Sequence, residues 1–371
     1  MRPNIILVLL DGARWDRLSS SSRFNKLQSK GFLFNNITTA MPYTVGAVNV
    51  IFSGLYGKEN GVDGYYKVLD LKKSVKTFAE ILKNNGYYTG CDLLHKNIIT
   101  ERGFDIHQAH NEYEDDLPIR HREFLKSSFE AAREAPVFCF LHYTKIHRIT
   151  VSEVLKKYEW DDSEFYDNIE QNLKRYDNVF EEACEYSSKI IDTIEELGKK
   201  ENTIIIFFSD HGTGVGERYG ERNYGSFTYE ETIRAFYLFI SKDILTNKIS
   251  SKLHSALDIF PTVLKLCNVL PDNLTSGRSL DQVLMNEKFE EFEDEHNFAE
   301  TGALHGPFPS PEKSNVFCIK TKQYKLIYLE SSQRWEFYDL SKDHVEKNNI
   351  IGENPALENE LKKKLLDWMN R

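Results

Sequence analysis

Two motifs place metal-binding side chains directly after apolar runs. Asp11 follows the run Ile5–Leu10, and Asp210 and His211 follow the run Thr203–Phe208 after one serine. Carboxylates and a neutral imidazole are hard and borderline ligands for a divalent cation. A helix cap at Asp11 and a simple polar turn at Asp210 are the alternative interpretations. If both runs are parallel strands, their carboxyl ends meet at one edge of the sheet, where ligands bind.

Thr44 is the candidate nucleophile. It lies in the segment Met41–Ala47, at the start of a helical pattern that runs to Ser53 and Gly54. The free N–H groups and the dipole of a helix N-terminus favour an anion. A hydroxyl placed there, next to a cation that lowers its pKa, can act as a metal ligand and as a nucleophile. The alternative is that Thr44 only caps the helix.

The elements that must position these residues alternate along the chain. Short apolar runs predict buried strands at Ile5–Leu10, Val137–Leu141, Thr203–Phe208 and Ala235–Ile240. Apolar residues at three- and four-residue spacing predict helices over Val75–Asn84, Tyr176–Leu197 and Leu257–Leu266. This alternation indicates an α/β fold with a mostly parallel central sheet flanked by helices.

The C-terminal part has a different pattern from about Glu290 onward. Strands are predicted at Val316–Lys320, Tyr324–Leu329 and Trp335–Leu340, and a closing helix at Leu357–Met369. We therefore expect a catalytic α/β domain over residues 1–285 and a small antiparallel α+β subdomain over residues 286–371. The acidic stretch Trp160–Asn178 is either a solvated surface helix or a lid over the site.

Composition excludes some classes of function. The chain has 371 residues and a net charge of -10, without a long Lys/Arg block, so a nucleic-acid-binding footprint is absent. The run Ile5–Leu10 is too short for a signal peptide or a transmembrane span. Five cysteines, an odd number without a CxxC pair, indicate a reducing compartment, and a cytoplasmic location is expected.

Read together in chain order, these motifs resemble a known family. Besides Asp11, Thr44 and Asp210-His211-Gly212, the resemblance rests on Ser53–Val62, Gly86–Thr89, Gly103–Asp105, Leu141-His142 with His147, Tyr229–Arg234, Asp258–Thr262, Lys325–Tyr328 and Tyr338–Leu340. The chain resembles the sulfatase-like branch of the alkaline phosphatase superfamily over nearly its whole length. That resemblance implies an alkaline phosphatase-like fold and an enzyme that acts on phosphate or sulfate esters.

The resemblance also implies roles for particular residues. The metal ligands would be Asp11, Thr44, Asp210 and His211, with Thr44 also the catalytic nucleophile. His147, Lys96 and His95 would bind the substrate, and His142 and His305 are candidates for a second metal. The expected cofactor is one divalent metal ion (Mn, Zn, Mg or Ca), with two as the alternative. His107 and His110 lie in a polar stretch and are expected to be solvated.

The sequence departs from the family at the nucleophile. Sulfatases of the main type carry Cys or Ser followed by Pro and Arg, and convert the first residue to formylglycine, whereas this chain has Thr44-Val45-Gly46-Ala47-Val48. The leading hypothesis is therefore a phosphoester hydrolase or phosphoryl-group transferase with a Thr nucleophile. A sulfatase without formylglycine and a catalytically inactive binding homologue are the alternatives.

The expected partner is a small anionic ester, or a phosphorylated or sulfated glycan or lipid head group. The family's lysine before Tyr229 is missing, since Asn223-Tyr224-Gly225 stand there. Arg14, Arg218 or Arg222 could supply that positive charge instead, although surface arginines are more often merely solvated. Oligomeric state is not indicated by the sequence.

Overall fold

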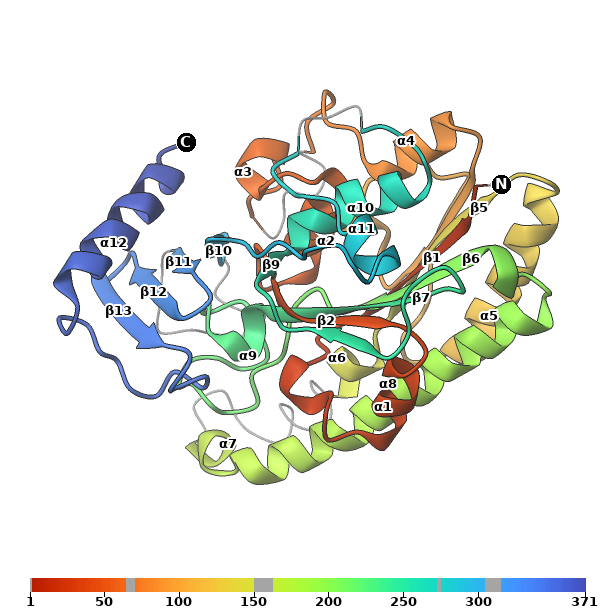
Figure 1. Ribbon diagram of the computed structural model, residues 1–371. Coiled ribbons are helices and arrows are strands. Elements are labelled where there is room, and N and C mark those ends of the chain that lie inside the picture. Colours follow the sequence, from red (N-terminus) through yellow and green to blue (C-terminus); the bar gives the residue numbers. More distant parts are fainter. Residues whose placement is uncertain (1, 65–70, 150–162, 272–274, 304–314) are drawn as a thin grey trace.

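A computed structural model describes residues 2–64, 71–149, 163–271, 275–303 and 315–371 (Figure 1). The strands are β1 Asn4–Leu10, β2 Phe32–Thr38, β3 Tyr88–Leu93, β4 Ile106–Ala109, β5 Val137–Tyr143, β6 Thr203–Phe208, β7 Arg234–Ile240, β8 Lys248–Ser250, β9 His254–Ser255, β10 Asn297–Glu300, β11 Val316–Lys320, β12 Tyr324–Leu329 and β13 Arg334–Asp339.

The α-helices are α1 Ser22–Gln28, α2 Thr44–Ser53, α3 Gly57–Asn60, α4 Phe78–Asn84, α5 Leu117–Ala132, α6 Lys145–Ile149, α7 Ser163–Asp167, α8 Ile169–Glu196, α9 Glu230–Ile233, α10 Ile259–Leu266, α11 Asp281–Met285 and α12 Pro355–Met369. Short 3-10 turns are η1 Trp15–Arg17, η3 Lys96–Ile98, η5 Lys200–Asn202 and η6 Ala256–Asp258. Among the helices of the described ranges, none combines the length and apolar character that a membrane crossing requires.

The large sheet is mostly parallel. Its strand order is β4-β3-β5-β1-β6-β7-β2-β8, with β9 paired to β2. Only β7 runs against its neighbours β6 and β2, while the other described pairs are parallel. The expected fold class is confirmed, and the carboxyl ends of β1, β5 and β6 lie together at one edge.

Successive side chains of β1 point to opposite faces of the sheet and contribute to two hydrophobic cores. Ile5 and Leu7 point to the face covered by α2, α4 and α10, while Ile6 and Val8 point to the face covered by α1, α5 and α8 (Figure 1). All seven residues of β1 are buried, as expected for a parallel strand covered on both sides. Two helix layers therefore hold the sheet rigid at the edge that carries Asp11.

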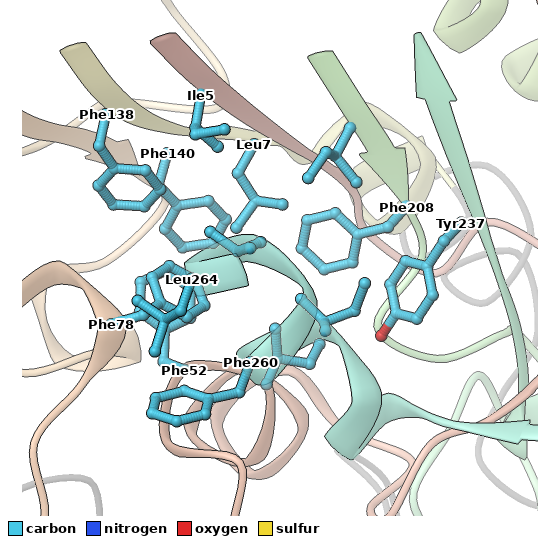
Figure 2. Packing of buried hydrophobic residues seen from close by; sticks show 14 of the residues in the cluster. Ile5, Leu7, Phe52, Phe78, Phe138, Phe140, Phe208, Tyr237, Phe260 and Leu264 are labelled. Atoms are coloured by element: carbon cyan, nitrogen blue, oxygen red, sulfur yellow. The ribbon is translucent and has the colours of Figure 1, made fainter. Parts of the chain in front are cut away.

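The core on the α2 side is rich in aromatic rings (Figure 2). Phe52 of α2 stacks on Phe78 with ring centroids 4.1 Å apart and lies 4.9 Å from the ring of Phe140. These contacts fix α2, the helix that begins at Thr44, against the sheet.

Truncation of Phe52 tests this anchoring. Phe52→Ala should lower the free energy of unfolding by about 3–5 kcal/mol, because it removes a fully buried ring and leaves a cavity. Urea denaturation measures the change. Leu270→Ala at an exposed position is the control and should stay within about 0.5 kcal/mol of wild type.

The C-terminal residues form a separate antiparallel sheet in the order β10-β11-β12-β13, with α12 packed on it (Figure 1). Predicted and observed bounds agree for β11 and β12, and β13 starts and ends one residue earlier than expected. A domain boundary after residue 285 stays a prediction. Buried ion pairs join the sheet to the large domain, since Glu230 lies 2.9 Å from Lys320 and 3.0 Å from Lys325.

Candidate active site

Four side chains from three elements meet at the carboxyl edge of the sheet. Asp11 follows β1, Asp210 and His211 follow β6, and Thr44 begins α2. Asp11 is 2% exposed, and Asp210 and His211 are fully buried. One ligand atom each from Asp11, Asp210 and His211 lies within 4.8 Å of the others, so the three can share one cation.

Thr44 does not cap its helix. Tyr43 is the N-cap residue, and Thr44 is the first residue of the helix itself. The helix therefore begins one residue earlier than a cap at Thr44 would imply. Its Oγ1 lies 3.4 Å from each carboxylate oxygen of Asp11 and 3.3 Å from Nε2 of His211. The hydroxyl is therefore turned toward the candidate ligands and not toward the backbone of its own helix.

Hydrogen bonding orients the His211 ring. Its Nδ1–H donates to the carbonyl oxygen of Gly212 over 2.7 Å, which leaves the lone pair on Nε2. That Nε2 lies 3.5 Å from Asp11 Oδ1 and 3.5 Å from Asp210 Oδ2. In a metal-binding histidine, the ring nitrogen that does not bind the metal commonly donates to a carbonyl oxygen or a carboxylate.

Asp210 has one oxygen held by the backbone and one without a partner. Its Oδ1 accepts from the N–H of His211 over 2.9 Å and of Gly12 over 3.4 Å, whereas its buried Oδ2 has no hydrogen-bond partner among the described residues. Two atoms bound at about 2.0–2.2 Å to one ion stand roughly 3–3.5 Å apart. The spacing, the free lone pair and the unpartnered oxygen fit a divalent cation.

The pKa values of the two aspartates are shifted in opposite directions. Burial disfavours the Asp11 carboxylate, but the hydrogen bond from His142 and the nearby His147 and His211 outweigh it, so the pKa of Asp11 is lowered. Burial and the negative charge of Asp11 raise the pKa of Asp210. A cation between the two carboxylates would relieve that repulsion.

His142 supports Asp11 from behind. Its Nε2 donates to Asp11 Oδ2 over 2.9 Å, and its Nδ1 accepts from the N–H of Leu94 over 3.4 Å. Both ring nitrogens are used, so the arrangement leaves no lone pair for the second metal expected at His142. The other expected second-metal residue, His305, lies outside the described residues.

Variants of His142 test whether this residue orients the Asp11 carboxylate. His142→Ala should lower metal affinity and kcat/KM by about 10- to 100-fold, because Asp11 loses the donor that fixes its carboxylate. His142→Gln, whose amide can reach the Nε2 position, should recover part of both. Titration with a metal indicator and steady-state kinetics give the two values, and equal losses in both variants would contradict the orienting role.

The residues expected to bind substrate lie at different depths. His147 on α6 packs against Tyr224, with ring centroids 5.4 Å apart, and Tyr224 packs against His211 at 4.4 Å. His147 therefore lies beside the candidate ligands. His95 and Lys96 are exposed at η3, and no hydrogen bond or ion pair within the described ranges joins them to the cluster. Their substrate-binding role stays a prediction.

The arginines considered as substitutes for the missing lysine are buried or paired. Arg14 is buried and lies 2.9 Å from Asp16, and Arg218 lies 2.9 Å from Glu231. Arg222 is buried, with its guanidinium 5.3 Å from the ring centre of Phe165. The expectation of solvated surface arginines is wrong for these positions, since each stabilises a loop around the site.

Sequence reasoning missed the loop that follows His211. Gly214 and Asn223 pair across it as a β-bridge, and Asn223 has a φ of 94°. Neither amide atom of Asn223 has a hydrogen-bond partner in the described residues, although the side chain is fully buried. An Asn beside Tyr224 carries no sequence signal for this, because only the folded loop pairs Asn223 with Gly214 and brings Tyr224 next to His211.

The same loop contains a buried acid. Burial raises the pKa of Glu221 to about 8, although the N–H groups of Ser226 and Phe227 donate to its carboxylate. An acid whose pKa is raised on folding contributes stability below its unfolded value of 4.5 and loses it as the pH rises through about 8. The wild-type melting temperature should therefore fall between about pH 4.5 and pH 8, partly through this group.

Glu221→Gln should make that fall smaller, because the neutral amide has no proton to lose. The measurement is a series of thermal melts across the pH range, with Glu353→Gln at an exposed position as the control. An unchanged slope in Glu221→Gln would show that other groups cause the pH dependence.

The fold and the clustered Asp11, Thr44, Asp210 and His211 define a class: enzymes with the alkaline phosphatase-like α/β fold. The sulfatase family model matches residues 3–269, and the model of the C-terminal region of N-sulphoglucosamine sulphohydrolase matches residues 221–371. The chain belongs to the sulfatase family and is an enzyme that hydrolyses sulfate or phosphate esters.

Individual relatives support the assignment. The chain is 23% identical to an arylsulfatase of Clostridium perfringens, over 95% of this chain and 90% of that protein. It is 30% identical to an N-acetylglucosamine-6-O-sulfatase of Bacteroides thetaiotaomicron, over 44% of this chain and only 29% of that protein. The solved phosphonate monoester hydrolase of Agrobacterium radiobacter has the same fold, with a TM-score of 0.75 at 17% identity over 99% of this chain and 95% of that chain.

Proposed function

We propose that the chain hydrolyses a sulfate monoester on a glycan, using one divalent cation and the unmodified hydroxyl of Thr44. The observation that carries the proposal is the convergence of Thr44 Oγ1 with Asp11 and His211 at 3.3–3.4 Å, next to the unpartnered Asp210 Oδ2. The arylsulfatase and the N-acetylglucosamine-6-O-sulfatase among the relatives support a sulfated glycan as the substrate. This differs from our leading sequence hypothesis, which preferred a phosphoester.

Charge supports a substrate with a single negative charge. Among the described residues, no Lys or Arg forms a hydrogen bond or ion pair with Asp11, Asp210, His211 or Thr44, and the side chains beside Asp11 are histidines. Two carboxylates and one divalent cation sum to zero charge. Such a centre favours the monoanion of a sulfate ester over the dianion of a phosphate monoester.

Asp11, Asp210 and His211 would hold the cation, which supplies electrostatic stabilisation of the transferring group and of the Thr44 alkoxide. Thr44 Oγ1 attacks sulfur in line, the S–O bond to the sugar breaks, and the sugar oxygen takes a proton from solvent water and leaves as an alcohol. The Thr44 proton leaves toward the Asp11 carboxylate, which faces the hydroxyl at 3.4 Å. Water then attacks sulfur and restores Thr44. His147 would contact the ester oxygens.

A second candidate function is hydrolysis of a phosphonate monoester or phosphodiester. These esters are also monoanions, and the related fold of the phosphonate monoester hydrolase supports them. The observation that favours this function is Thr44 itself, because an unmodified hydroxyl requires a second attack on the esterified centre to release the product. Transfer to an alcohol acceptor in place of water is the corresponding transferase reaction.

A substrate panel tests the proposal. The protein, loaded in turn with Mn²⁺, Zn²⁺, Mg²⁺ or Ca²⁺, is assayed with 4-nitrophenyl sulfate, phosphate, phenylphosphonate and phosphodiester, and with 6-O-sulfated N-acetylglucosamine. We expect the highest kcat/KM on a sulfate ester and the lowest on the phosphate monoester. Preference for the phosphodiester or phosphonate would establish the second candidate. Binding of sulfated sugar without turnover of any ester would indicate an inactive binding homologue.

A further inference from the structure

A second group of metal-binding side chains lies behind the active site. Asp92 is the penultimate residue of β3, His110 follows β4, and His121 lies on α5. One ligand atom from each lies within 4.8 Å of the others, and all three side chains are buried. The expectation that His110 is solvated is wrong, because the loop after β4 folds its ring against Asp92.

The ring nitrogens of this group approach Asp92 at distances longer than is usual for hydrogen bonds. His110 Nδ1 lies 3.3 Å from Asp92 Oδ1, and His121 Nε2 lies 3.9 Å from Asp92 Oδ2. N–H···O bonds in proteins are usually about 2.7–3.2 Å long. Donor atoms that share one ion stand roughly 3–3.5 Å apart. The His110 contact with Asp92 has this spacing, as do the contacts between Asp11, Thr44 and His211, and the His121 contact is longer.

His121 provides an independent indication of a ligand. Its Nδ1 is bonded to the hydroxyl of Tyr186 over 2.6 Å, while its Nε2 is buried and has no hydrogen-bond partner among the described residues. Either ring tautomer leaves Nε2 unpaired, and an unpaired buried polar atom costs about 1–3 kcal/mol. The Tyr186 hydroxyl is placed to hold the proton on Nδ1 and leave the Nε2 lone pair for a cation.

His110 has the same arrangement. Its Nε2 faces the hydroxyl of Thr144 over 3.4 Å, so a proton there leaves the Nδ1 lone pair directed at Asp92. Two acceptor atoms that face each other need a cation or a proton between them. Both imidazoles are thus held by hydroxyl groups on the side away from Asp92.

Arg120 is the competing explanation for this cluster. Its Nε donates to Asp92 Oδ2 over 2.6 Å, and Gln108 donates to the same oxygen over 3.2 Å. Arg120 reaches Asp92 Oδ1 only at 3.4 Å and also pairs with Asp115 at 3.4 Å. Oδ2 is therefore satisfied, Oδ1 has only the long contacts with His110 and Arg120, and Asp115 offsets the charge of Arg120.

We propose that Asp92, His110 and His121 form a second, structural Zn²⁺ site that joins β3, β4 and α5. Two imidazoles and one carboxylate suit Zn²⁺ better than Mg²⁺ or Ca²⁺, which prefer oxygen ligands. The ring of His110 lies 6.2 Å from the ring of His142, which holds Asp11. The ion would therefore fix the layer directly behind the catalytic aspartate. This site does not depend on the proposed function.

The test uses the full chain with the first site disabled and the second intact. An Asp11→Asn/Asp210→Asn double variant is equilibrated with Zn²⁺, passed over a weak chelator and analysed by mass spectrometry of the metal content. We expect about one Zn²⁺ per chain in this variant and two in the wild type. Replacement with Co²⁺ should give the visible absorption of a four-coordinate site with nitrogen and oxygen ligands. Zn²⁺ should also raise the melting temperature of the double variant by mass action.

Two further variants locate the ion. Adding His121→Ala to the double variant should reduce the metal content to zero, whereas adding His107→Ala should leave it at one. His107 is a matched control, since it lies on β4 and its Nε2 is bonded to the carbonyl of Ile99 over 3.2 Å. A double variant that folds, by circular dichroism, yet retains no Zn²⁺ and gives no Co²⁺ absorption would overturn the proposal and leave Asp92 as a hydrogen-bond and ion-pair partner of Arg120, Gln108 and His110.

Discussion

Replacing Thr44 with valine is expected to lower turnover of the best ester substrate by about three orders of magnitude or more. Valine keeps the shape of threonine but removes the hydroxyl that lies 3.3–3.4 Å from His211 and Asp11. A nucleophile lost from a concerted site is not replaced by its neighbours. Fold stability should change little, because the hydroxyl caps no backbone group of α2.

Thr44→Ser is the matched control, since the attacking oxygen survives and measurable turnover should remain. Rapid quenching of the wild type followed by peptide mass spectrometry should detect a sulfuryl or phosphoryl group on the Thr44 peptide. Thr44→Cys should not create an efficient sulfatase, because Gly46 and Val48 stand where the modification motif needs Pro and Arg. Near wild-type turnover in Thr44→Val would mean that water attacks directly and that the covalent mechanism is wrong.

Strands covered on both faces could be predicted from the sequence because their apolar runs are continuous. The predicted β6 has the observed bounds Thr203–Phe208, and β1 and β7 differ by one residue at the start. The strand β2, Phe32–Thr38, was missed because Asn35 and Asn36 interrupt its apolar pattern. A register shift between Phe34 and Ile37 accommodates them, and only the pairing with β7 shows this.

The candidate ligands could be predicted for a similar reason. Asp11 and Asp210 each follow a strongly apolar run, so a parallel sheet brings them together without any knowledge of the loops. Tyr224, Asn223 and His110 could not be predicted, because their positions depend on how long connections fold back. Burial of His110, for example, arises from its contact with Asp92, 18 residues away in the chain.

The chemical step was harder to predict than the site. Thr44 in place of a convertible Cys or Ser favoured phosphate chemistry, whereas the relatives are mainly sulfatases. The structure shows why the residue alone could not decide. In the proposed mechanism, an unmodified hydroxyl at 3.4 Å from Asp11 would attack either sulfur or phosphorus, and the charge of the surrounding groups would then select between a monoanion and a dianion.

Asp210→Asn is expected to remove the first metal and with it nearly all ester hydrolysis. The amide keeps the shape of the side chain but replaces one carboxylate with a neutral group, so the cation loses a charged ligand. The N–H groups of His211 and Gly12 can still donate to the amide oxygen, since both now donate to Oδ1. We expect the folded structure to persist and kcat/KM to fall by about three orders of magnitude or more, as for loss of a concerted catalytic group.

Stability distinguishes this result from simple misfolding. In the metal-free wild type, burial raises the pKa of Asp210, and the negative charge of the neighbouring Asp11 raises it further. Removing one charge should therefore leave the melting temperature of the metal-free protein unchanged or higher, while added metal should stabilise only the wild type at this site. Asp192→Asn at an exposed position on α8 is the control and should behave as wild type. A variant that keeps both its first metal and its turnover would show that Asp210 is not a ligand, and a variant that unfolds without metal would show that its carboxylate is needed for the fold.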